Sequence, residues 1–102
     1  MQNQPNPNQQ NGQMQIKISD DVLKGVYANA LQVGHTKEEF ILDYMNLVPP
    51  QGIAVARVFL SPGHMKRIVS ALQDNLKKYE EQFGKISMAE TPSSDGKVGF
   101  NG

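Results

Sequence analysis

The sequence predicts an α+β domain, in which an antiparallel β-meander of about four strands is followed by one long C-terminal amphipathic helix. Three observations lead to this expectation. Short stretches rich in β-branched and aromatic residues recur between residues 14 and 60, as is typical of strands. A turn signal, Pro49-Pro50-Gln51-Gly52, separates two of these stretches. Residues 61–84 carry apolar side chains at helical spacing between a serine and a glycine.

The composition limits the number of domains and the classes of function. The chain has 102 residues, with ten Lys or Arg, ten Asp or Glu and no cysteine. We expect one domain over residues 14–86, between a disordered Gln/Asn/Pro-rich tail (1–13) and a second disordered tail (87–102). The lack of cysteine excludes disulfides, thiolate chemistry and cysteine metal sites. A core of this size is marginal by itself, which favours a homodimer.

The sequence also predicts where the protein works. It has no apolar run long enough to span a membrane, and its first residues do not resemble a signal peptide. We therefore expect a cytoplasmic protein that does not engage a membrane. A net charge of zero removes the bulk electrostatic argument for nucleic acid, although a local basic patch would still bind it.

The first element expected in chain order is a strand over residues 14–18. Met14, Ile16 and Ile18 alternate with polar residues, which predicts one buried face. Asp20 to Gly25 then forms a turn or a single helical turn.

The next two segments, residues 26–36 and 40–48, fit either a strand or a helix. The second is rich in β-branched and aromatic residues, yet Thr36-Lys37-Glu38-Glu39 before it is a formal capping box. Gly25 and Gly34 would each weaken a helix by about 1 kcal/mol relative to alanine. Periodicity leaves both segments open, with strands slightly favoured.

The segment Ile53–Leu60 is the clearest strand, because it is apolar on both faces except at Arg57. This pattern predicts a central strand with a cover on each face, the helix on one side and a second subunit on the other.

The helix follows directly. Ser61 suits the N-cap, Pro62 the first helical position and Gly84 the residue past the end. One stripe gathers the large apolar side chains, which are Met65, Val69, Leu72, Leu76, Tyr79 and Phe83, widened by Ile68 and Ala71. Burying each large side chain contributes roughly 1.5–3 kcal/mol, so burial decides whether the helix forms.

The charges of this helix oppose its dipole, with basic residues in the first turns and acidic residues in the last. Three interpretations remain open. The stripe is symmetric about Asp74, so an antiparallel copy would bring Arg67 opposite Glu81. Alternatively, the first turn binds an anion or a partner carboxylate. The third interpretation is plain solvated charge. The candidates for the anion or partner site are Ser61, Gly63, His64, Lys66 and Arg67.

Catalytic and metal sites are hard to assemble from this sequence. A metal site would need His35, His64 and a carboxylate such as Asp43, whose spacing fits no metal motif. A Ser–His–Asp catalytic set could be drawn from Ser61, His64 and Asp43, but Ser61 is better explained as the N-cap of the helix. The chain lacks a dinucleotide GxGxxG and a P-loop. We expect no catalytic residue, no metal and no cofactor.

Two long pieces carry a recognisable set of motifs. They are YANALQVGHTKEEFILDYMNLVPP (27–50) and ARVFLSPGHMKRIVSALQDNLKKYEEQFGKI (56–86). Over about residues 15–86 this set resembles a family of small bacterial domains of unknown function. The resemblance implies an antiparallel sheet followed by the C-terminal helix, and so favours strands for the two ambiguous segments. It implies no activity.

Our leading hypothesis is a non-enzymatic, homodimeric module that binds another protein. The alternative is a dimer that binds single-stranded nucleic acid through the sheet and the basic start of the helix. In the order of its elements alone, the chain resembles small coactivator-type dimers that bind single-stranded DNA. The sheet-surface candidates are Lys17, Tyr27, Asn29, His35 and Arg57. For the polar cluster of Tyr27, Asn29, His35 and Thr36, one ordinary solvent-exposed face of the sheet is the simpler interpretation.

Overall fold

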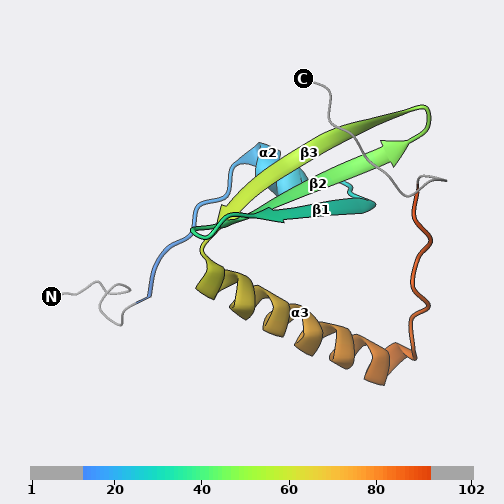
Figure 1. Cartoon of the computed structure of the whole chain (residues 1–102). Helices are drawn as coiled ribbons and strands as arrows, with labels where there is room; N and C mark the ends of the chain where they lie inside the picture. Colours follow the sequence, from blue (N-terminus) through green and yellow to red (C-terminus); the bar gives the residue numbers. More distant parts are fainter. Residues whose placement is uncertain (1–12, 93–102) are drawn as a thin grey trace, which may run out of the picture.

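The computed structural model describes residues 13–92 and confirms the α+β layout, with an antiparallel sheet followed by a C-terminal helix. The elements in chain order are α2 (Asp20–Lys24), β1 (Ala30–His35), β2 (Phe40–Val48), β3 (Gln51–Leu60) and α3 (Pro62–Phe83) (Figure 1). Most of the two expected tails, residues 1–12 and 93–102, lies outside the described residues. Within residues 13–92, no helix combines the length and apolar character that a membrane span requires.

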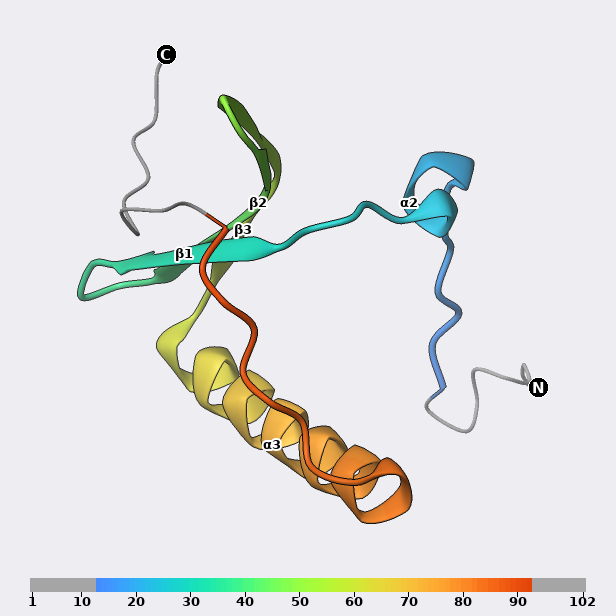
Figure 2. The ribbon, with the colours of Figure 1, turned by 90° about the vertical axis from the view of Figure 1, so that its right-hand side faces the viewer.

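The expected strand over residues 14–18 is wrong, and the described part of the chain forms three strands rather than four. Met14 and Ile16 are 87 % and 90 % exposed. Alternating apolar and polar residues would give a strand one apolar face, but a strand also needs a neighbouring strand edge to bond its N–H and C=O groups. Figure 2 shows this segment leading away from the sheet beyond α2. The helical turn expected after it is confirmed as α2, which Ser19 caps through a bond from the Val22 amide.

Both ambiguous segments contain strands, and they form a hairpin. β1 pairs with β2 from Ala30 opposite Met45 to His35 opposite Phe40. Thr36 closes the loop between them, because its Oγ1 accepts bonds from the amides of Glu38 and Glu39 at 3.1 and 3.3 Å. The capping-box residues therefore build a hairpin turn and do not start a helix.

The central strand is β2, so the expectation that Ile53–Leu60 would be central is wrong. β3 pairs only with β2 and leaves its other edge open among the described residues. The apolar content of a strand reports the burial of its faces and not its place in the sheet. The register shifts between Tyr44 and Met45, where β3 carries one extra residue.

The core of the single chain is very small. Of the described residues, only Leu42 (4 % exposed) and Met45 (2 %) are buried apolar side chains, both on β2. α3 starts at the sheet and diverges from it, as Figures 1 and 2 both show. The radius of gyration is 18.5 Å, whereas a compact domain of 100 residues has about 13 Å. The chain therefore folds into an open shape.

The ends of α3 are set by the expected residues. The Ser61 hydroxyl accepts a bond from the His64 amide at 3.2 Å, and Pro62 occupies the first turn. Gly84 ends the helix at φ 96°, a conformation that residues with a side chain adopt at a cost.

We predict that Ser61→Ala lowers the free energy of unfolding by about 1 kcal/mol, because one amide of the first turn loses its acceptor. Urea unfolding followed by circular dichroism measures this change. Ser70→Ala, inside the same helix, is the matched control and should not destabilise the protein. Equal effects of the two changes would contradict the assigned cap.

Candidate functional site

The most distinctive surface of the chain is one side of the sheet, which we call the apolar sheet face. Residues that are directly opposite in antiparallel strands point to the same side, so the register defines this face. Only Leu42 at its centre is buried, and its neighbours Val33 and Val58 remain exposed. The apolar sheet face consists of Leu31, Val33, Phe40, Leu42, Tyr44, Val58 and Leu60.

The apolar stripe of α3 is also uncovered. No residue of this helix is buried, and Leu72 and Phe83 are 65 % and 66 % exposed. The rings of Tyr79 and Phe83 lie against each other, with centroids 5.0 Å apart. An exposed apolar stripe of this length is unusual for a soluble monomer.

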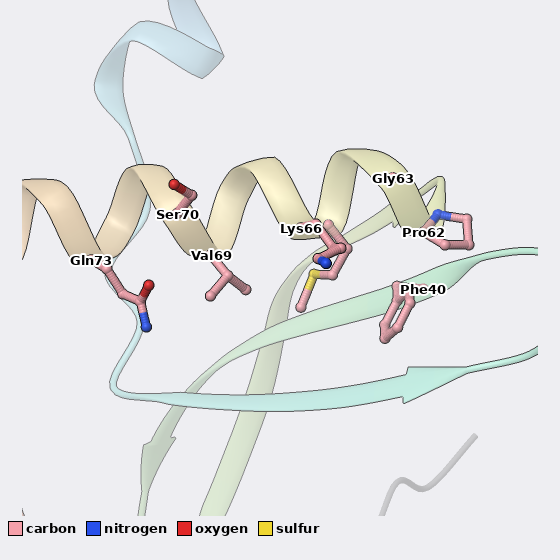
Figure 3. A pocket seen from close by; sticks show the side chains of 8 residues that line it. Phe40, Pro62, Gly63, Lys66, Val69, Ser70 and Gln73 are labelled. Atoms are coloured by element: carbon pink, nitrogen blue, oxygen red, sulfur yellow. The ribbon is translucent and has the colours of Figure 1, made fainter.

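A cavity of about 650 Å³ lies where the two apolar surfaces meet. Figure 3 shows Phe40 on the strand across the cavity from α3, with Lys66 and Val69 on the side of the helix that faces the strands. The residues lining the cavity are Phe40, Pro62, Gly63, Met65, Lys66, Val69, Ser70 and Gln73. Because the lining is mostly apolar, this cavity suits an apolar or aromatic group better than a charged one.

A second cavity, of about 410 Å³, lies at the far end of the β2–β3 hairpin. The register places its strand residues on the apolar sheet face as well. Its lining consists of Asn46, Val48, Pro50, Gln51 and Ile53. The apolar sheet face thus extends from one cavity to the other.

The opposite side of the sheet carries one strong ion pair. Arg57 donates from Nε to Asp43 Oδ1 at 2.6 Å and from Nη2 to Oδ2 at 3.1 Å. These two strands place the residues directly opposite each other. The hydrogen bonds from Arg57 lower the pKa of the Asp43 carboxyl, although burial of that carboxyl opposes the shift. Arg57 therefore holds strands together, and much of its charge is neutralised.

The five candidates at the start of α3 do lie on adjacent turns, but several of their polar groups have partners. The His64 amide, expected to bind an anion, donates to the Ser61 hydroxyl. Arg67 Nη2 lies 3.1 Å from Nδ1 of His64, which fixes that ring nitrogen as an acceptor. Gly63 and Lys66 line the first cavity. The first turn of α3 therefore forms one edge of the first cavity and is not an open anion site.

The sheet-surface candidates do not form one cluster. Lys17 lies in the N-terminal segment and Tyr27 precedes β1, so neither belongs to the sheet. His35 lies on the apolar side against Phe40, with ring centroids 5.4 Å apart. Arg57 lies on the other side. The structure separates these side chains onto different surfaces.

Asn29 has a structural use. Its side chain donates to the Leu47 carbonyl at 3.0 Å and accepts from the Leu47 amide at 2.8 Å. These two bonds extend the β1–β2 pairing beyond Ala30, where β1 begins. The sequence offered Asn29 only as a candidate for the sheet surface. Its role against Leu47 could not be predicted, because Leu47 is 18 positions away and the register was not known.

The groups considered for catalysis or metal binding are not brought together. Among residues 13–92, no three or more His, Asp or Glu side chains are grouped as a metal ion would require. Both histidines are exposed, and neither lines the two cavities described above. Asp43 is engaged by Arg57, and the Ser61 hydroxyl by the helix cap.

We predict that Asn29→Ala lowers the free energy of unfolding by about 1–2 kcal/mol, because two hydrogen bonds to Leu47 are lost. Gln32→Ala, at an exposed polar position of the adjoining strand β1, should have a smaller effect. Urea titration of both variants measures the difference. The two variants would unfold at the same urea concentration if the Leu47 contact did not matter.

The lowered pKa of Asp43 predicts a pH dependence of stability. The Asp43 carboxyl ionises more easily in the folded chain than in the unfolded chain. Its contribution to the free energy of unfolding is therefore complete above the unfolded pKa of about 3.9. That contribution is lost as the pH falls through the lower, folded value. Asp43→Asn should therefore destabilise the protein at neutral pH and flatten the acid side of its stability profile.

Thermal unfolding between pH 2 and pH 7 measures this profile. Asp21→Asn is the control, since the Asp21 carboxylate is 97 % exposed and reaches Lys24 only at 4.0 Å. An unchanged acid limb in Asp43→Asn would show that the pair does not control acid stability.

Comparison with known proteins gives a family and no function. No protein of curated function and no solved structure matches the chain. A family model described as "Protein of unknown function (DUF3467)" matches residues 1–88. This match covers most of the chain, including the sheet, the apolar stripe and both cavities. The chain therefore belongs to the DUF3467 family of proteins of unknown function.

Proposed function

We propose that this protein is a non-enzymatic, homodimeric module that works by binding another protein. One observation carries the proposal: the chain has the elements of a domain but buries only two of its apolar side chains among the described residues. The apolar sheet face and the stripe of α3 stay in water. Surfaces of this kind and extent are used for association.

Self-association is the first use of this surface. α3 diverges from the sheet after its start, and most of its stripe stays exposed within the chain. A helix in water derives its stability mainly from packing of its apolar face and only slightly from propensity. A second copy supplies that packing wherever the protein is present.

The hairpin end of the apolar sheet face supports the binding of a different protein. The second cavity there joins apolar side chains to the amide groups of Asn46 and Gln51. Such a lining suits an apolar side chain presented on a peptide backbone, because the amides can satisfy backbone N–H and C=O groups.

Binding of single-stranded nucleic acid is the alternative function, and the sedimentation experiment below tests it. Among the basic candidates, Arg57 is paired with Asp43, Lys17 lies away from the sheet and Lys66 lines the first cavity. No observation on the described residues gathers them into a positive groove that tracks a phosphate backbone.

We predict that the purified protein sediments as a dimer at micromolar concentration and dissociates on dilution. Sedimentation velocity over a concentration series measures this behaviour, first with the protein alone and then with a labelled single-stranded oligonucleotide at low salt. A protein that stays monomeric throughout would overturn the proposal. Comigration with the oligonucleotide, lost in Lys66→Ala/Arg67→Ala, would replace it with the nucleic-acid function.

A further inference from the structure

We propose that two copies join through antiparallel packing of their α3 stripes. In this arrangement the partner's Phe83 reaches the cavity beside Phe40, and the partner's Glu80 pairs with Lys66. The inference deepens the proposed homodimer, on which it rests, by assigning its geometry.

The positions of the large apolar residues in the stripe are symmetric about the middle of the helix. Around Asp74, Leu72 is matched by Leu76 at equal distances along the helix. The outer pairs are Val69 with Tyr79 and Met65 with Phe83. Two antiparallel copies related by a two-fold axis therefore place an apolar side chain against an apolar side chain at every level. A parallel pair would instead set the two aromatic ends side by side.

The first cavity lies at the level where the partner's aromatic residues would arrive. Met65 and Val69 both line this cavity. In the antiparallel pair the partner's Phe83 lies at the level of Met65 on the midline of the stripe, whereas the partner's Tyr79 lies at the level of Val69 on the border away from the cavity. Because Met65 and Val69 belong to the stripe, this cavity borders the stripe directly. The apolar lining and the aromatic occupant match in chemistry.

The charge pairing expected between Arg67 and Glu81 is wrong for this contact. Successive residues of a helix are rotated by about 100°, which puts both of these side chains on the side opposite the stripe. Arg67 contacts His64 on its own helix instead.

Lys66 and Glu80 lie on the border of the α3 stripe, where side chains of the two helices can meet. Both lie along the same border of the stripe, and in an antiparallel two-fold pair that border meets the same border of the partner. Along the helix axis, Lys66 and the partner's Glu80 are offset by two residues, or about 3 Å, which these side chains can span. Glu80 is half-buried, and its Oε2 already accepts a bond from the Ile86 amide at 3.0 Å, which orients the carboxylate. The dimer would contain this ion pair twice.

The test is a charge exchange in the full chain. Lys66→Glu and Glu80→Lys each create two like-charge contacts, so each should raise the dimer dissociation constant about tenfold or more. The double variant Lys66→Glu/Glu80→Lys restores opposite charges and should return to within about threefold of the original constant. Sedimentation equilibrium measures all four proteins, and circular dichroism checks that each is folded.

The matched controls are Arg67→Glu and Glu81→Lys, which make the same charge changes on the far side of the helix. They should leave the dissociation constant unchanged. If the original protein is dimeric but the single exchanges have no effect, or the double variant fails to recover, this geometry is overturned while the homodimer stands. A monomeric original protein overturns both.

Cross-linking gives a second readout that does not depend on affinity. The chain has no cysteine, so introduced thiols react alone. A mixture of Lys66→Cys and Glu80→Cys copies, treated with a short bismaleimide, should yield a cross-linked dimer in high yield, whereas each variant alone should not. The mixture of Arg67→Cys and Glu81→Cys should remain uncross-linked. Efficient linking of Lys66→Cys to itself would indicate a parallel pair and overturn the proposal.

Discussion

Burial of apolar surface is the constraint on which the rest of this structure depends. The described chain places Leu42 and Met45 on opposite sides of β2, and nothing else apolar is buried around them. Three strands with a helix attached at one end cannot enclose more, because the helix leaves the sheet within its first turns. The uncovered stripe and the apolar sheet face follow from this geometry. In the homodimer that we propose, a second copy of the chain would cover this surface.

The polar side chains, by contrast, are largely used to build the fold. Ser19 and Ser61 cap helices, Thr36 closes a hairpin and Asn29 clamps Leu47. Each takes up backbone groups that would otherwise lack partners. Arg57 is instead fixed across the strands by the side-chain carboxylate of Asp43. With these groups occupied, the chemistry that distinguishes the molecule is apolar, which is why an association role fits it better than an anion site.

Local signals predicted most of the architecture. Ser61, Pro62 and Gly84 predicted the ends of α3, because caps act over a few residues. For β2, β-branched and aromatic content favoured a strand only slightly over a helix, and the family resemblance added the remaining support. Distant contacts could not be predicted in this way. Asn29 and the Asp43–Arg57 pair depend on a register that periodicity does not define. Ile16 shows the converse limit, since an alternating pattern without an available sheet edge forms no strand.

The attachment of α3 to the sheet at its N-terminal turn has a consequence for any ligand of the assembled protein. An antiparallel pair of 22-residue helices, each about 33 Å long, would hold the two sheets at opposite ends. Each hairpin cavity would then occur twice, at a spacing set by the helix pair. A partner carrying two matching segments at that spacing would engage the second at a high effective concentration. The dimer would therefore favour repetitive or dimeric partners through avidity, even where each individual contact is weak.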